Sequence, residues 1–565
     1  MYLHSLSIEN FRGIRNARLD FDETTVIIGE NDSGKSSLLE ALAMALLPSG
    51  DGAPMFEPQH FHRESIAPSA RPVGPVRLKL TFQERQAGEW DAAGFASLAG
   101  VLGKAAGKPR QLLLRVTAAP SSGEQIIAGS WEMASTGAGG APSQNDTAAL
   151  ATLRALNPLV WLRGGALVGA GPAAGPVPRP EAQAPADIAH LVEEIEQRYQ
   201  AVISGDTRHA HDELRAGYES ARELLALRAI ETRTSRGLGQ PLLAEVLGAP
   251  GSTESRRVRA MHGSAAQQLG VFILTAALLR HHPGATAPGA QPLLVIEDPE
   301  AHLHLMTLAS VWGLLEHIQA QKIISTHSGT LLAAAPLHTV RRLTRHQGEV
   351  RQWSVPRDRF KTDDLRKLSY HLRARRGVAS FARCWLLVEG ETEFWILPEL
   401  ARMHGYDFSL EGVAVVEFAQ CGLAPLVGLA RELGIQWHVL TDGDRAGSHY
   451  ADTAASFMAG DQRRLRLTRL RDVDIEHCFW HHGYAAMLKQ AAGLPGGAPV
   501  LARQAINRAI KRLSKPYLAF ELLIAVTQPG SAGVPKPLRQ VIDTCVQLAR
   551  GAPQYCHSGH VDEQL

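Results

Sequence analysis

Apolar and polar residues alternate at the start of the chain, as they do in strands with one buried face. Leu6 and Ile8 lie two positions apart, and the apolar run 26–28 follows. A glycine-rich turn then leads into 35–47, where apolar residues recur with helical spacing. Alternation over 76–82 and 111–117 predicts two more strands. The chain therefore begins as an α/β domain.

The later pattern predicts an insertion and a second α/β domain. Glycine, alanine and proline dominate 164–186, which favours a surface linker. The charged helical pattern of 187–235 predicts an inserted hairpin that packs on the domain or, as we slightly favour, forms a dimer contact. Short buried strands at 385–388 and 439–440 end in acidic residues. The predicted segments are 1–186, 187–235, 236–336, 337–377, 378–490 and a helical 491–565.

Length and charge narrow the picture further. A chain of 565 residues predicts several domains, because single cores stop growing near roughly 250–300 residues. The 58 Lys and Arg nearly balance the 56 Asp and Glu, which excludes a uniformly basic surface. Five cysteines lie far apart without a CxxC pair, so neither a zinc ribbon nor a disulfide framework is predicted. Without a signal peptide or an apolar run of ~20 residues, we expect a cytoplasmic protein with no membrane partner.

The sharpest motif is GENDSGKS at 29–36, which fits GxxxxGK[ST] between an apolar strand and a helix. Its glycines let backbone N–H groups curl around phosphates, and the helix N-terminus adds partial positive charge. Lys35 would reach the β- and γ-phosphates, and the Ser36 hydroxyl would ligate Mg²⁺. We therefore expect ATP to bind here. The predicted contacts of this loop are Gly29, Asn31, Gly34, Lys35, Ser36 and Ser37.

A second phosphate-site element lies at 293–300, where a buried strand would deliver two carboxylates at its end. We assign Glu297 to the metal ion and Asp298 to activation of the attacking water. The strand at 323–325 is followed by His327. A γ-phosphate sensor is favoured for this histidine over a packed or surface residue.

These motifs resemble the ABC-type ATPases of the SMC/RecF group. The resemblance rests on SIENFRG at 7–13, EDPEAHLH at 297–304 and STHS at 325–328. It implies an ATPase split into 1–186 and 236–336. It also implies a signature loop, for which HGSAAQQ at 262–268 is the best match. Gln59 is a candidate for the glutamine of the family's Q-loop, with an ordinary loop residue as the alternative.

The last third carries two acidic clusters at predicted strand ends. Glu389 ends one strand and Glu393 follows on the first turn of a helix, whereas Asp442 and Asp444 end another strand. Residues two apart on a strand face the same side, so the two aspartates could share one ion. Gathered carboxylates repel one another unless cations neutralise them, which favours Mg²⁺ or Mn²⁺. No His/Cys cluster suggests zinc. Ordinary surface acids are the alternative.

This arrangement resembles the TOPRIM domain of topoisomerases, primases and OLD (overcoming lysogenization defect) nucleases. An ABC-type ATPase followed by TOPRIM in one chain resembles the OLD family, which is also seen in defence systems such as Gabija. The resemblance implies a TOPRIM domain at 378–490 with a helical C-terminal part, DNA cleavage with two metal ions, and a catalytic lysine. The family's further acids and lysine match Glu393, Glu476 (Asp474 second) and Lys515, with Lys536 as the rival.

Basic residues gather in two segments. Residues 337–383 contain 13 Lys and Arg against four Asp and Glu, and five arginines lie in 463–471. Phosphate neutralisation needs such patches, so we expect salt-sensitive DNA contact from the connector 337–377 and its neighbour. A solvated charged face is the alternative.

The sequence thus predicts a dimeric, metal-dependent DNA endonuclease fused to an ATPase, in phage defence or DNA repair. The alternative is a nucleotide-switched DNA-binding clamp with a TOPRIM domain that does not cut. A third reading is an effector that needs a helicase-like or other defence partner.

Overall fold

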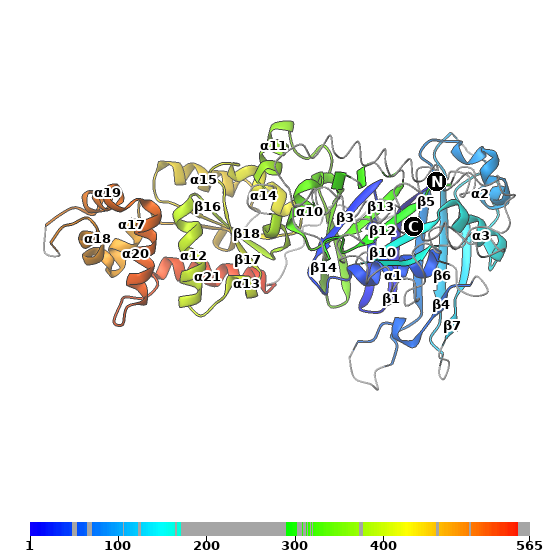
Figure 1. Ribbon diagram of the computed structural model, residues 1–565, viewed down its shortest axis with the longest axis horizontal. Helices are drawn as coiled ribbons and strands as arrows, with labels where there is room; N and C mark the ends of the chain where they lie inside the picture. Colours follow the sequence, from blue (N-terminus) through cyan, green and yellow to red (C-terminus); the bar gives the residue numbers. More distant parts are fainter. Residues whose placement is uncertain are drawn as a thin grey trace, which may run out of the picture. The chain divides into compact units, whose positions relative to one another are not determined.

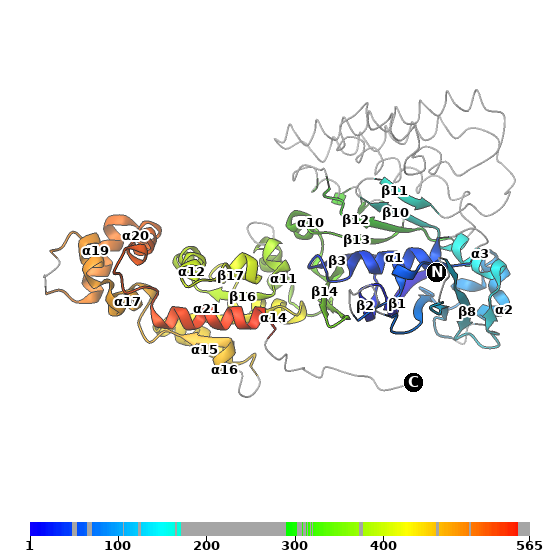
Figure 2. The ribbon, with the colours of Figure 1, turned by 90° about the horizontal axis from the view of Figure 1, so that it is seen from below.

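The structure, a computed structural model, forms two compact units, Met1–Ser354 and Val355–Leu565, which are taken in turn (Figure 1, Figure 2). The expectations for 187–235, 262–268 and 373–376 lie outside the described residues. Those residues are 1–47, 53–64, 71–104, 107–121, 126–163, 166–170, 290–301, 308, 312–313, 315–316, 318, 320–371, 377–458, 463–495 and 499–551.

One large sheet organises the described part of the first unit. Its strands, in spatial order, are β11 (Ala166–Ala170), β10 (Leu159–Arg163), β12 (Leu293–Glu297), β13 (Gln321–Ser325), β3 (Thr24–Gly29), β14 (Val340–His346), β15 (Glu349–Ser354), β2 (Ile14–Asp20), β1 (Tyr2–Phe11), β5 (Val76–Gln83), β6 (Gln111–Ala118), β8 (Ser130–Ser135) and β9 (Ser143–Gln144). From β10 to β14 the neighbours pair in parallel. From β2 to β9 they pair antiparallel.

The parallel strands lie at the centre of the first unit. Every residue of β12 and β13 is buried, as expected for strands covered on both faces. Helix α1 (Lys35–Leu46) lies along the sheet and buries Leu38, Leu39 and Leu42 (Figure 1). The remaining elements are α2 (Ala99–Leu102), α3 (Thr147–Leu156), α10 (Gly329–Ala334), η1 (Pro58–His60), η2 (Glu89–Asp91), η3 (Ala93–Leu98), η4 (Leu337–Thr339) and the pair β4 (Met55–Phe56) and β7 (Ile127–Ala128).

Two predicted segments differ from the structure. Part of the expected linker 164–186 forms β11, which pairs with β10. The expected connector 337–377 begins inside the large sheet, because β14 pairs with β3 and β15 pairs with β2. Arg341 and Arg342 are buried there, and Arg341 Nη2 donates to Asp22 Oδ2 at 2.7 Å. Their charge therefore serves the fold, which a count of basic residues could not reveal.

A four-stranded parallel sheet organises the second unit. Its order is β17 (Val413–Glu417), β16 (Cys384–Val388), β18 (Gln436–Thr441) and β19 (Leu467–Arg469). Right-handed crossovers place α12 (Glu391–Met403) on one face, and α14 (Leu423–Glu432) and α15 (Arg445–Ala455) on the other (Figure 1). From β16 the chain continues to β17 on one side of β16, and then to β18 on the other side. The strand order therefore reverses between β16 and β18, which is the topological switch point.

Further helices complete the second unit. Helix α20 packs on α12, and α21 packs on β16 and β18. Leu386, Leu397, Leu522 and Ile542 belong to their common core. None of the described helices is both long and apolar enough to cross a membrane. The further elements are α11 (Thr362–His371), η6 (Gly377–Phe381), α13 (Phe408–Glu411), α16 (Arg463–Arg466), α17 (Ile475–Phe479), the π-helical turn η8 (Trp480–Tyr484), α18 (Ala485–Ala491), α19 (Ala502–Leu513), α20 (Lys515–Thr527) and α21 (Lys536–Ala549).

Candidate functional site

The glycine-rich loop joins β3 to α1 as the motif predicts. Gly29 has φ 154°, and a Cβ there would lie 2.6 Å from the Leu343 carbonyl oxygen, so glycine is required. Lys35 Nζ donates to the carbonyl oxygens of Gly29 and Glu30, both at 2.7 Å. Helix α1 begins at Lys35, which places Ser36 and Ser37 in its first turn. The loop thus directs an ammonium group and a helix N-terminus toward one point, as anion binding requires.

Burial lowers the pKa of Lys35 to about 8, and the charges of Asp298, Asp32 and Glu30 oppose this effect. The ammonium group therefore gains from a negatively charged ligand. The influence of Asp298 also shows that the end of β12 lies beside the loop. Lys35 and Asp298 come from distant parts of the sequence and meet here because β12, β13 and β3 are parallel neighbours.

The end of β12 carries both predicted carboxylates. Glu297 is 2% exposed and pairs in register with Ser325 of β13. The next residue, Asp298, has φ 50° and donates its backbone N–H to the Ser325 carbonyl at 3.1 Å. The carboxyl ends of parallel strands meet at one edge of a sheet, so Glu297 and Asp298 lie at the edge where β3 opens into the loop.

Sequence reasoning gave Glu300 no role, yet this residue orders the loop that carries His327. One Glu300 oxygen accepts the backbone N–H of His327 at 2.5 Å, and the other accepts the Thr326 hydroxyl at 2.9 Å. Partial burial of the His327 side chain and the charge of Lys35 lower its pKa. The only available signal was the third acid of the sequence EDPE at 297–300. The structure therefore brings Lys35, Asp298 and His327 together.

Gln59 lies in η1, where its side chain donates to Glu57 Oε2 at 2.6 Å. It lines an open cavity of about 530 Å³ together with Arg12, Gly13, Pro58, Phe61 and Arg63. Arg345 connects this region to the phosphate loop, because its guanidinium contacts Gly13 O and Asp32 Oδ2. The structure thus places Gln59 in a loop near the nucleotide site, with its amide bonded locally.

The second candidate site lies at the switch point of the four-stranded sheet, where α/β folds commonly bind ligands. Glu389 directly follows β16, and Asp442 and Asp444 follow β18. Gly443 donates its N–H to Asp472 O at 3.0 Å, and a Cβ on Gly443 would lie 2.2 Å from that oxygen. The loop after β18 therefore packs, through Gly443, against Asp472 in the segment that precedes α17.

Three further acids approach from helices. Glu393, on the first turn of α12, accepts the Gly390 N–H at 3.2 Å, and Glu476, in α17, is 2% exposed. Asp474 caps α17 by accepting the N–H of His477 at 2.8 Å and its Nδ1–H at 2.6 Å. Asp474 is therefore engaged in a cap, which leaves Glu476 the better placed metal ligand of the two.

The pKa shifts show that these carboxylates form one cluster. Burial, together with the charges of Glu393, Glu389, Asp474 and Glu476, raises the pKa of Asp442 to about 8. Burial is also the first cause that raises the pKa of Glu476, to about 7. The pKa values of Glu389 and Glu393 are raised too, again mainly by burial. The metal-free cluster is thus costly to ionise.

One cation offsets this charge. Lys515, at the start of α20, lowers the pKa values of Glu389, Glu393 and Glu476. Lys536, at the start of α21, is not one of the charges that chiefly shift the pKa values of these described carboxylates. The structure therefore brings Lys515 into the cluster rather than its rival.

The cluster fits divalent metal ions of the Mg²⁺ class. Glu389 Oε2 and Glu476 Oε1 are buried oxygens that have no hydrogen-bond partner among the described residues. Such oxygens are costly unless a cation or donor satisfies them. Carboxylate oxygens are the ligands that Mg²⁺ and Mn²⁺ prefer. Glu389, Glu393, Asp442, Asp444 and Glu476 could hold such ions.

The basic segments differ in availability. Arg466 donates to Trp437 O and Gln436 Oε1, and Arg469 donates to Gly443 O at 2.9 Å, so these two arginines stabilise the fold. Arg463, Arg464 and Arg471 are exposed. The charge near the acidic cluster is therefore only partly available to a ligand.

Two family matches cover successive parts of the chain. Residues 1–379 match the family described as "Protein of unknown function (DUF2813)", and 381–444 match "Overcoming lysogenization defect protein-like, TOPRIM domain". "Uncharacterized protein YbjD" of Escherichia coli (strain K12) is 33% identical over 584 residues, which covers 98% of this chain and 100% of that protein. The DNA replication and repair protein RecF of Rickettsia massiliae (strain Mtu5) is 51% identical over 45 residues, 8% of this chain and 12% of that protein.

Two solved structures were also matched. The SMC head domain from Thermotoga maritima covers 63% of this chain and 100% of its own, at 15% identity and a TM-score of 0.29. The C-terminal region of the Burkholderia pseudomallei OLD protein covers 30% of this chain and 99% of its own, at 17% identity and a TM-score of 0.25. On the family matches, the chain belongs to the DUF2813 family, and its residues 381–444 match the OLD-like TOPRIM domain.

Proposed function

We propose that this protein is an ATP-binding and ATP-hydrolysing, divalent-metal-dependent DNA endonuclease. The observation that carries the proposal is the carboxylate cluster at the switch point of the second unit, with Lys515 beside it. A domain that only binds DNA gains nothing from buried acids that raise one another's pKa values. A metal-dependent phosphodiesterase needs such acids to hold its cations.

Each residue of the cluster has a role in this proposal. Glu389, Asp442 and Asp444 would hold the core ion, and Glu393 and Glu476 would extend the site to a second. When bound, two ions stabilise the attacking and leaving oxygens of a phosphodiester. Lys515 would offset the negative charge that grows on the phosphate oxygens.

The head would bind ATP through the loop at 29–36 and gate assembly or DNA access. The lowered pKa of Lys35 supports an ammonium group that gains from phosphate. Ser36 and Glu297 would share the Mg²⁺ ion of the nucleotide, and Asp298 would orient the attacking water. His327, held through Glu300, would sense the γ-phosphate.

The exposed arginines beside the cluster support DNA as the substrate. Arg463 and Arg464 would contact the phosphate backbone without reading sequence, so binding would weaken with salt. The short match to the DNA replication and repair protein RecF supports action on DNA, and we propose a role in the cytoplasm, in phage defence or DNA repair. The protein would act there as a homodimer, alone or with a helicase-like partner.

The test is cleavage of supercoiled plasmid by the full chain with Mg²⁺, Mn²⁺ or Ca²⁺, with and without ATP. We expect metal-dependent nicking that Asp442→Asn lowers by at least about 100-fold. Asp452→Asn, an exposed aspartate of α15, is the matched control and should cut like the wild type. Lys35→Ala should abolish ATP hydrolysis while Asp442→Asn retains it.

Retained DNA binding and ATP hydrolysis without cleavage, under every metal, would overturn the nuclease and favour the nucleotide-switched clamp. Cleavage that survives in Asp442→Asn would instead point to a contaminating enzyme.

A further inference from the structure

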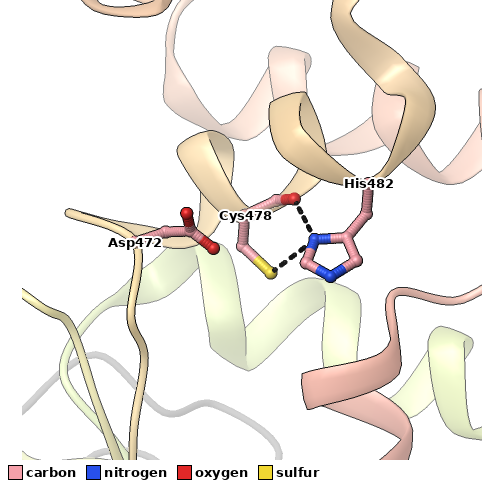
Figure 3. A group of neighbouring side chains, drawn as sticks. All are labelled: Asp472, Cys478 and His482. Carbon is pink, nitrogen blue, oxygen red and sulfur yellow. Dashed lines mark hydrogen bonds between the residues drawn. The ribbon is translucent and has the colours of Figure 1, made fainter.

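A second group of side chains that could hold a metal ion lies in and beside α17. One ligand atom each from Asp472, Cys478 and His482 lies within 4.8 Å of the other two (Figure 3). Cys478 lies in α17, and His482 follows in the π-helical turn η8, where its own backbone leaves the helical conformation. The sequence predicted no His/Cys cluster, because Cys478 has no nearby cysteine and its partners meet it only in the fold.

The three side chains already contact one another. His482 Nδ1 donates to the Cys478 carbonyl at 2.7 Å and lies 3.7 Å from Cys478 Sγ. Figure 3 shows the thiol between the imidazole and the Asp472 carboxylate. His481 adds a hydrogen bond, from Nδ1 to Asp472 Oδ1 at 2.6 Å, which fixes the carboxylate. Ligating carboxylates in metal sites are commonly held by such an outer partner.

We propose that Asp472, Cys478 and His482 bind one thiophilic divalent cation of the Zn²⁺ class, at a site distinct from the acidic cluster. The sulfur, nitrogen and oxygen set is one that Zn²⁺ accepts, whereas Mg²⁺ requires oxygen ligands. Three protein ligands leave a fourth tetrahedral position for water.

The position of the thiol agrees with this assignment. Cys478 is buried, and its sulfur lies between the imidazole and the carboxylate (Figure 3). A bound cation would displace the thiol proton and replace the His482 hydrogen bond to the Cys478 carbonyl. A buried thiol beside both an imidazole and a carboxylate is thus suited to metal binding rather than to nucleophilic chemistry.

The site has a direct connection to the acidic cluster. The Asp472 carbonyl accepts the N–H of Gly443, which lies between Asp442 and Asp444. Asp472 also lies four residues before Glu476 in the sequence. A cation held by Asp472 and α17 would therefore fix both loops that carry the acidic ligands. The metal site itself does not depend on whether those ligands cut DNA.

The test uses the full chain after chelator treatment, titrated with Co²⁺ in place of Zn²⁺. Only a thiolate ligand gives a sulfur-to-cobalt charge-transfer band in the near ultraviolet. We expect this band at one equivalent, and we expect Zn²⁺ to abolish it. Cys478→Ser should eliminate the band, and His482→Gln should weaken Co²⁺ binding at least about tenfold.

Three controls separate this site from others. Cys421→Ser and Cys556→Ser should keep the band, and Asp442→Asn should keep it because the acidic cluster contributes no sulfur. Circular dichroism checks that each variant folds, and His482→Gln tests the site if Cys478→Ser does not fold. A folded wild type without the band, or a band that persists in Cys478→Ser, would overturn the proposal even if plasmid cleavage is observed.

Discussion

Replacing Asp442 by asparagine should stabilise the metal-free protein at high pH. In the folded chain burial and the neighbouring acids raise the Asp442 pKa from 3.8 to about 8. Between these two pH values the folded state holds a proton that the unfolded state has released, so stability falls as pH rises. Above pH 8 the folded state must carry the charge, and the full cost applies.

The magnitude follows from the shift. One pKa unit corresponds to about 1.4 kcal/mol, which sets an upper limit of about 6 kcal/mol on the cost of ionising Asp442 in the fold. Water entry and local relaxation reduce this figure, because the effective dielectric constant of protein sites is about 20. We expect Asp442→Asn to raise the free energy of unfolding by about 2 kcal/mol above pH 8 and by nothing below pH 4.

The assay is equilibrium urea unfolding with chelator present, followed by tryptophan fluorescence across the pH range. Buried Trp385 and Trp437 report on the second unit. Asp452→Asn should follow the wild type at every pH. Added Mg²⁺ should stabilise the wild type and leave Asp442→Asn nearly unchanged, because the variant lacks a ligand. Equal pH dependence in Asp442→Asn and wild type would refute the reasoning.

Three further outcomes are expected. Lys515→Gln should lower plasmid cleavage about 100-fold, whereas Lys536→Gln should leave cleavage unchanged. Loss of cleavage in Lys536→Gln alone would instead identify Lys536 as the catalytic lysine. Glu300→Gln should slow steady-state ATP hydrolysis about tenfold with little effect on nucleotide binding, because the loop of His327 loses a charge-assisted hydrogen bond; an unchanged rate would refute this. Gly443→Ala should destabilise the second unit by about 1–3 kcal/mol in thermal unfolding, since its Cβ would overlap a backbone oxygen; an unchanged melting temperature would contradict the packing.

Local patterns were sufficient to predict the strands and loops that carry the sites. The phosphate loop directly follows a strand, and so do Glu389 and Asp442. These positions could be predicted because an apolar strand and the loop after it are recognisable from consecutive residues. Parallel pairing then brings the ends together. The α/β class was predicted for the same reason, whereas the two domain types were predicted from the resemblance of the motifs to known families.

What the sequence could not decide depends on packing between distant segments. Lys515 and Lys536 both precede a proline and both begin a helix, so their local sequences do not separate them. Only the packing of α20 against α12 brings Lys515 to the acids. The local sequence likewise does not separate the buried Arg341 from the exposed Arg345, because only the pairing of β14 inside the sheet distinguishes them.

The position of β14 and β15 sets how this chain can be divided. These two strands join the parallel and antiparallel halves of the large sheet. Strand β14 pairs with the phosphate-loop strand β3, and β15 pairs with β2 of the antiparallel half. A chain cut after residue 336 would split the sheet and leave β3 as an unprotected edge, open to pairing with other molecules. A cut after Ser354 would keep both halves joined. The segment that precedes the second unit is thus the same one that joins the two halves of the large sheet.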